Sequence, residues 1–129
     1  MKKVSIRSSR VSGFPAPTSL AIRSGNLLFL SGMAAHNLEG KIVGVGDADA
    51  QTRQALDNLA ALMEEVGGTL DDIVKLTVFV QDIADRPTIN KVRAEYFHEP
   101  FPAATLIQVS RLAREGALVE IEAIAVVRA

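Results

Sequence analysis

The end of the chain alternates between two kinds of residue, and this alternation limits what the chain can fold into. Successive side chains of a strand point to opposite faces of a sheet. One face of this segment is wholly apolar and consists of Ala117, Val119, Ile121, Ala123, Ala125 and Val127. The other face is mixed and consists of Leu118, Glu120, Glu122, Ile124 and Val126. We therefore predict a strand over residues 118–127 that packs beneath helices on one side only.

Residues 49–66 have the apolar spacing of a helix with one buried side. The positions that form this spacing are Ala55, Leu56, Leu59, Leu62, Met63 and Val66. Asp47 or Asp49 can cap the start of the helix. The pair Gly67-Gly68 supplies the left-handed stop that commonly ends a helix.

A shorter apolar stripe predicts a second helix over residues 86–98. The stripe consists of Ile89, Val92, Tyr96 and Phe97. Asp85 is the expected N-cap, and Pro87 fits the first turn. Pro100 prevents the helix from continuing, because proline cannot donate the backbone hydrogen bond that a helix interior needs.

The remaining β-rich runs complete the expected architecture. They are residues 3–7, 19–23, 27–31, 73–80 and 104–109. Residues 24–26 favour a hairpin between the second and third of these strands. The order β-β-β-α-β-α-β-β indicates an α+β protein, with both helices on one face of one sheet. A chain of 129 residues is expected to form a single domain, residues 1–129.

Two helices can cover only one face of such a sheet. The second face of the last strand is substantially apolar, and Thr77 and Phe79 lie on the corresponding face of residues 73–80. A large uncovered apolar patch is rare on a monomer, so we predict a homo-oligomer. The alternative is a sheet with one solvated face and a few exposed apolar residues.

Composition excludes several classes of function. The net charge is −1, which argues against a nucleic-acid partner. The chain has no cysteine, and neither histidine, His36 or His98, has neighbours at metal-ligand spacing, so we expect no metal and two solvated histidines. No apolar run is long enough for a signal peptide or a membrane span, and we expect a cytoplasmic protein with no membrane partner.

Glu120 and Glu122 are the first candidates for chemistry. They lie on one strand face, about 7 Å apart. A carboxylate in or beside a subunit interface is partly desolvated, which raises its pKa and suits acid–base catalysis. Ion pairing or exposure to solvent is the alternative, and it is the favoured one for Glu122. For Glu120 the residues alone leave both interpretations open.

Two further features could bind a ligand. Ser31-Gly32 ends the third strand and could offer backbone N–H groups to a carboxylate, although an ordinary strand-end turn has the same pattern. Asn90 lies beside Ile89 early in the second helix, where it could point towards a ligand or face solvent. The run Gly44-Val45-Gly46 lacks the spacing of a phosphate loop, so we expect no phosphate site there.

Four segments, in order, resemble the Rid (reactive intermediate deaminase, YjgF) family. They are residues 25–32, 51–59, 72–80 and 116–125, within a similarity that spans about residues 17–128. The resemblance implies a chorismate-mutase-like (YjgF-like) fold and a homotrimer with clefts between subunits. It also implies hydrolysis of small enamines and imines, such as 2-aminoacrylate, without metal or organic cofactor.

The family's functional residues are retained in part. Ser31, with Gly32, matches the serine of the family's cleft, Asn90 matches its helix asparagine, and Glu120 matches the acidic residue that handles the hydrolytic water. Ala104 stands where the family has an arginine. An arginine binds a carboxylate bidentately and alanine offers no replacement, so the usual substrate loses its anchor.

Other cleft positions also differ from the family pattern. Thr18 replaces a tyrosine, and Leu106 stands where the family often has cysteine. The predicted pocket is therefore larger and more apolar, and Glu120 lacks a neighbouring cation. Arg111 or Arg114 could supply one only if the loop that carries them folds back.

These observations favour a hydrolytic deaminase of an enamine or imine other than 2-aminoacrylate. Glu120 is the predicted catalytic residue, and the predicted substrate-binding residues are Ser31, Gly32, Asn90, Thr18, Ala104 and Leu106. A non-catalytic trimer that binds a metabolite or another protein is the alternative. RNA cleavage comes last, because the chain has no basic patch and no histidine pair.

Overall fold

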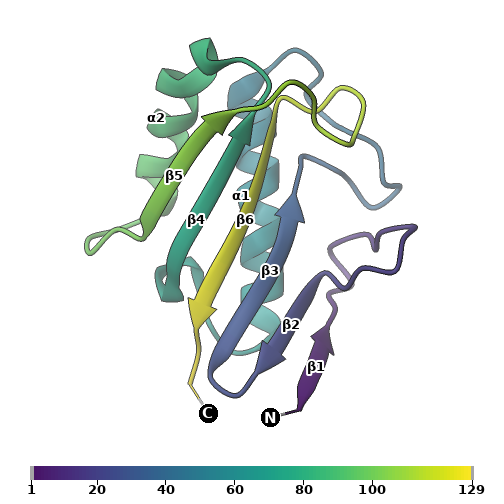
Figure 1. The fold of residues 1–129 in the computed structure, drawn as a ribbon, viewed down its shortest axis with the longest axis vertical. Coiled ribbons are helices and arrows are strands. Elements are labelled where there is room, and N and C mark those ends of the chain that lie inside the picture. Colours follow the sequence, from purple (N-terminus) through teal and green to yellow (C-terminus); the bar gives the residue numbers. More distant parts are fainter. Residues whose placement is uncertain (1, 129) are drawn as a thin grey trace.

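The computed structural model describes residues 2–128 and contains one six-stranded sheet with two helices (Figure 1). The strands are β1 (Lys3–Ile6), β2 (Ala21–Ser24), β3 (Leu27–Met33), β4 (Ile73–Val80), β5 (Ala103–Gln108) and β6 (Val119–Val126). The helices are α1 (Ala48–Glu65) and α2 (Arg86–Tyr96), with short 3₁₀ turns η1 (Leu70–Asp72) and η2 (Ile83–Asp85). The predicted order of strands and helices is confirmed.

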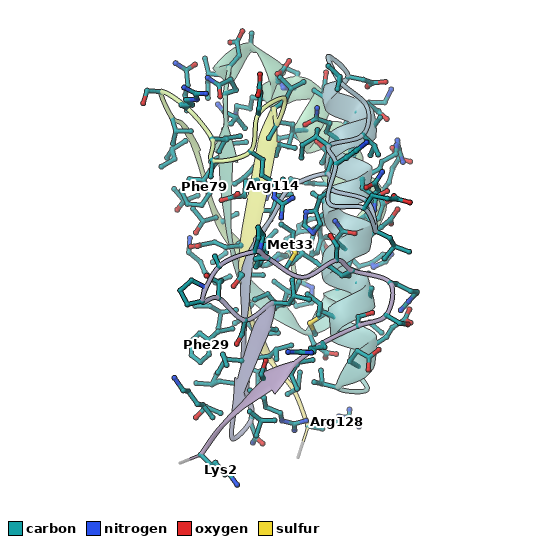
Figure 2. All side chains as sticks on the ribbon, turned by 90° about the vertical axis from the view of Figure 1, so that its right-hand side faces the viewer. Lys2, Phe29, Met33, Phe79, Arg114 and Arg128 are labelled. Carbon is teal, nitrogen blue, oxygen red and sulfur yellow. The ribbon has the colours of Figure 1, made fainter. Side chains whose placement is uncertain are left out.

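The strands lie in the order β1-β2-β3-β6-β4-β5. All neighbours are antiparallel except β4 and β5, which are parallel and are joined through α2. The last strand of the chain therefore lies in the middle of the sheet, between β3 and β4. Both helices cover the same face, and the opposite face has no helix over it (Figures 1 and 2).

The core lies between this sheet and the helices, as the alternation of β6 predicts. All six apolar residues of its first face are buried. The apolar positions of α1 are also buried, except Val66, which is partly buried at the end of the helix. On the uncovered face, Leu27, Phe29, Ile107 and Val126 remain exposed. The predicted α+β fold with helices on one face is confirmed.

The helix ends follow from local chemistry. Asp47, rather than Asp49, caps α1, because its carboxylate accepts the Ala50 N–H at 3.0 Å. Beyond the helix, Gly67 has a φ of +76°, a conformation that glycine adopts without strain. Asp85 precedes α2 but makes no side-chain cap, and α2 ends at Tyr96, earlier than predicted, because Phe97 is already extended.

The end of β3 differs from the prediction. This strand continues to Met33, and its pairing with β6 shifts between Leu30 and Met33. Ser31 and Gly32 therefore lie inside the strand at an irregularity, not at its end. Among residues 2–128, no helix is long and apolar enough to cross a membrane.

Candidate functional site

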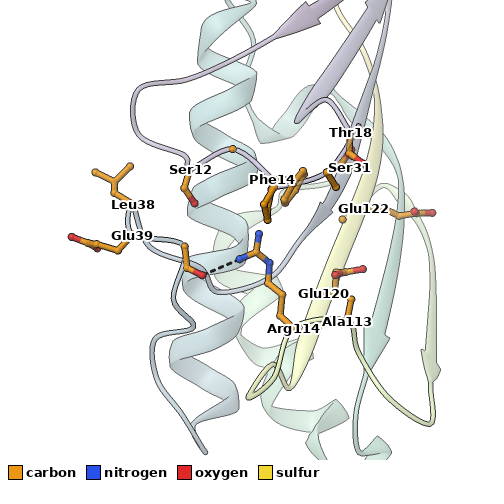
Figure 3. A pocket seen from close by; sticks show the side chains of 15 residues that line it. Ser12, Phe14, Thr18, Ser31, Leu38, Glu39, Ala113, Arg114, Glu120 and Glu122 are labelled. Atoms are coloured by element: carbon orange, nitrogen blue, oxygen red, sulfur yellow. Dashed lines mark hydrogen bonds between the residues drawn. The ribbon is translucent and has the colours of Figure 1, made fainter.

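A cavity of about 1050 Å³ opens where β3 and β6 meet the loops at one end of the sheet (Figure 3). The loop of residues 12–18 forms one wall, and residues 38–40 and 113–114 form another. The cavity brings together six residues that the sequence singled out, namely Thr18, Ser31, Gly32, Arg114, Glu120 and Glu122. It is therefore the place in one chain where most of the predicted polar groups meet.

Glu120 owes its position in this cavity to Gly32. A Cβ atom added at Gly32 would lie 2.6 Å from Oε2 of Glu120, so the carboxyl group occupies the space that a side chain at residue 32 would need. This packing leaves Glu120 partly buried. Burial raises the pKa of Glu120; the charge of Arg114 lowers it and that of Glu122 raises it, with a net upward shift. The carboxyl group can thus exchange a proton closer to neutral pH than an ordinary glutamate.

Glu122 differs from Glu120 although the same strand carries both residues. It lies opposite Thr77 of β4 and is exposed. No glycine makes room for its side chain against the neighbouring strand. Exposure to solvent is the interpretation that the sequence favoured for Glu122, and the structure agrees with it.

Arg114 reaches the cavity because the loop before β6 folds back. Its Nη1 donates to the Gly40 carbonyl at 3.1 Å, and its guanidinium lies 5.4 Å from the centre of the Phe14 ring (Figure 3). Arg111 does not line the cavity. Glu120 therefore has a cationic neighbour, contrary to the expectation drawn from Ala104.

Ser31 uses both of its donors within the protein. Its N–H donates to the Leu20 carbonyl at 2.9 Å, and its hydroxyl donates to the Ser19 carbonyl at 2.6 Å. Its N–H is therefore not free for a ligand, which corrects one expectation, and only the hydroxyl oxygen remains as an acceptor. Thr18 is exposed at the cavity wall.

The other candidates lie on α2 and on β5, an edge strand of the sheet (Figure 1). Ala104 and Leu106 pair with Leu76 and Val78, which are buried beneath the helices. Because paired residues point to the same face of a sheet, Ala104 and Leu106 face the helix side. Asn90 is exposed on α2 and accepts a hydrogen bond from Arg93 at 3.0 Å. A single chain thus divides the candidate residues into two groups.

His36 is buried, so the prediction of a solvated surface histidine is wrong. Its side chain is 1% exposed, and its ring packs edge-on against Phe14 with centroids 5.9 Å apart. Burial, with the nearby charge of Arg114, lowers the pKa of His36 to about 4. The loop that carries His36 folds back onto α1. A loop has no periodic pattern of apolar residues, so the burial of His36 could not be predicted from the sequence. His98 is exposed, as predicted, and lies 3.0 Å from Asp71.

Two buried amides on α1 position the loops around the cavity, and neither was predicted from the sequence. Gln51 donates to the carbonyls of Gly44 and Gly116 and accepts from the Leu118 N–H. Asn58 donates to the carbonyls of Ala34 and His36. Both amides continue the buried stripe of α1 at helical spacing. A polar residue inside an apolar stripe was the signal that could have revealed them.

Comparison with known proteins gives a consistent family. The family model described as Endoribonuclease L-PSP matches residues 15–127. The 3-aminoacrylate deaminase RutC of Acinetobacter baylyi is 39% identical, covering 85% of this chain and 86% of the relative. A 2-iminobutanoate/2-iminopropanoate deaminase of Dermatophagoides farinae is 36% identical, covering 86% of each chain.

Solved structures agree with the sequence matches. A Rid family protein from Yersinia pestis superposes with a TM-score of 0.92 at 38% identity, covering 98% of this chain and 100% of the other. The match extends over the sheet, both helices and the loops that form the cavity. The chain therefore belongs to the Rid/YjgF family, whose family model is described as Endoribonuclease L-PSP.

Proposed function

We propose that this protein is a hydrolytic deaminase of a small enamine or imine other than 2-aminoacrylate. The observation that carries the proposal is the partly buried Glu120, whose carboxyl group lies across Gly32 in the cavity. Two relatives named as deaminases of 3-aminoacrylate and of imino acids support the class of reaction.

The reaction balances with water alone. The enamine tautomerises to an imine, and a water molecule adds to the C=N carbon while Glu120 takes a proton from the water. The C=N electron pair moves to nitrogen, and Glu120 returns its proton to that nitrogen. The hydroxyl of the resulting carbinolamine gives its proton to the nitrogen through Glu120, the C–N bond breaks as the C=O bond forms, and ammonia leaves. The imine and one water thus yield a carbonyl compound and ammonia, and Glu120 returns to its starting state. No metal or organic cofactor is needed for this balance.

We place the complete site in clefts between the subunits of a homotrimer. The exposed apolar residues of the uncovered sheet face support such an assembly. The division of the candidates supports it too, because Glu120 lies on the central strand β6 and Asn90 lies on α2, so one chain does not bring them together. A neighbouring subunit can bring the α2–β5 edge against the Glu120 cavity of another.

We expect the substrate to differ from that of typical members, because the cleft differs from theirs at three positions. Ala104 lacks the guanidinium that would hold a carboxylate beside β5. Thr18 and Leu106 replace residues with larger polar or more reactive side chains. A bulkier imine fits a cleft of this composition better than 2-aminoacrylate does.

Turnover of imines generated in situ tests the proposal. Amino-acid oxidation supplies 2-aminoacrylate and larger imino acids, and ammonia release is followed with wild type, Glu120→Ala and Ala104→Arg. We expect wild type to accelerate hydrolysis of a larger imine, Glu120→Ala to lose this acceleration, and Ala104→Arg to gain activity on 2-aminoacrylate. If wild type accelerates no imine, the deaminase proposal fails. Saturable metabolite binding without turnover would then favour a non-catalytic module, and RNA cleavage would favour a nuclease.

A further inference from the structure

A second cavity, of about 340 Å³, lies between α2 and the segment that leads into β5. Its polar lining consists of Asn90 and Arg93 alone. Its remaining walls are Ala94, Phe97, Phe101 and Pro102. This composition, one cation and one amide among apolar groups, is typical of a site for a small anion with an apolar part.

Arg93 lacks the carboxylate partner that two other arginines of the chain, Arg10 and Arg53, have. Arg53 bonds to Asp49 and Glu95 at 2.8 Å and 2.7 Å, and Arg10 pairs with Glu64. Arg93 forms no ion pair with any of residues 2–128. It is nevertheless partly buried, and its Nε is buried without a hydrogen-bond partner. A desolvated cation without a counter-ion is unfavourable, and a bound anion would relieve that cost.

Asn90 is oriented to complete such a site. Its Oδ1 accepts from Nη1 of Arg93 at 3.0 Å, which fixes the amide plane. Its Nδ2 forms no hydrogen bond within residues 2–128 and is free to donate. The guanidinium fork and this amide together present several N–H groups at one end of an apolar cavity. A planar carboxylate accepts such a set of donors.

We propose that Arg93 and Asn90 bind the carboxylate of a small organic acid. The assignment deepens the proposed function, on which it rests in one respect: Arg93 would supply from α2 the guanidinium that is absent at Ala104 on β5. Pro102, two residues before Ala104, lines this cavity, and Ala104 faces the same side of the sheet. An anchor on α2 holds the carboxylate at a different place from one on β5, and so selects a substrate of different length.

Side-chain NMR of the full-length ¹⁵N-labelled protein tests the assignment. Pyruvate, methyl pyruvate and inorganic phosphate are titrated separately, while the Nε–H signal of Arg93 and the Nδ2 signals of Asn90 are followed. We expect pyruvate to shift both signals saturably and methyl pyruvate, which lacks the carboxylate, to leave them unchanged. Arg93→Met should weaken pyruvate binding about 10- to 100-fold, as expected for loss of charge-assisted hydrogen bonds.

Two variants keep the test specific. Lys91→Met removes one positive charge from an exposed position of the same helix and should bind pyruvate like wild type. Arg93→Lys keeps the charge without the planar fork and should bind less tightly than wild type. Unchanged binding by Arg93→Met, no saturable shift with pyruvate, or tighter binding of phosphate than of pyruvate would overturn the assignment.

The result is independent of turnover. Binding at Arg93 without imine hydrolysis would uphold the anchor while the deaminase proposal fails. Hydrolysis that is indifferent to Arg93→Met would uphold the deaminase proposal and remove the anchor.

Discussion

The Glu120 cavity and the Arg93 cavity each contain a partly buried charged side chain, but they differ in how its charge is balanced. Glu120 lies near the positive charge of Arg114, and the guanidinium of Arg114 donates a hydrogen bond to the Gly40 carbonyl. Arg93 has one amide contact and no carboxylate within residues 2–128. A group that exchanges protons needs neighbours that adjust its pKa, whereas a group that binds an anion is best left unpaired. The proposed function and the proposed anchor follow this difference, with chemistry in the first cavity and binding in the second.

Among variants that keep Glu120 itself, the largest effect should come from filling the space beneath its carboxyl group. Gly32→Ala places a methyl group 2.6 Å from Oε2 of Glu120 and displaces the carboxyl group, while the flexible side chain lets the fold persist. We expect imine hydrolysis to fall about 100-fold, as a misplacement of about 1 Å can cause. Gly13→Ala is the matched control, because a Cβ at Gly13 in the same cavity meets nothing within 4 Å. Equal rates for the two variants would contradict the role of Gly32.

The buried His36, which packs against Phe14 of the Glu120 cavity, makes the stability of the fold sensitive to acid. Its folded pKa of about 4 lies below the ordinary value of 6.5, so the unfolded state binds the proton first. The free energy of unfolding is therefore highest above pH 6.5. It decreases as the pH falls towards 4, by up to about 3 kcal/mol.

Urea denaturation over this pH range checks the prediction. His36→Leu should remove most of the acid-induced loss, and His98→Leu, at an exposed position, should not. Parallel curves of unfolding free energy for wild type and His36→Leu would show that His36 is not the cause.

The two arginines should respond oppositely to the same truncation. Arg114→Met loses a hydrogen bond to the Gly40 carbonyl and the Phe14 ring contact, and should cost about 1 kcal/mol of stability. Arg93→Met removes a partly buried cation without a counter-ion and should be neutral or stabilising. Thermal unfolding at pH 7 in a buffer free of carboxylates measures both. If Arg93→Met is the more destabilising change, the contrast between the two regions is wrong.

Most of the fold could be predicted from patterns that burial imposes. The alternation of residues 117–127 gives the two faces of the central strand, and the stripe of α1 gives the helix that covers one of them. Strands and helices repeat with a fixed number of residues, so both patterns can be recognised in a single sequence. The end of β3 was predicted less well, because an irregularity in pairing with β6 has no period.

The candidate site was predicted in its residue types but not in its contacts. Glu120 was recognisable by its place on the strand face and by family resemblance. Its dependence on Gly32 arises from pairing between β3 and β6, which are far apart in the chain. The same holds for Arg114, which a folded loop brings to the cavity, and for Arg93, whose missing counter-ion is visible only once α2 and β5 are in place.

The pH dependence of ammonia release by wild type and Glu120→Gln tests the central claim most directly. The amide keeps the size of the carboxyl group but cannot take a proton from water. We expect a loss of about 100- to 10,000-fold for Glu120→Gln. Wild type should lose activity as the pH falls through a value above the ordinary glutamate pKa, because burial raises the pKa of Glu120. Activity of Glu120→Gln equal to that of wild type would contradict the account.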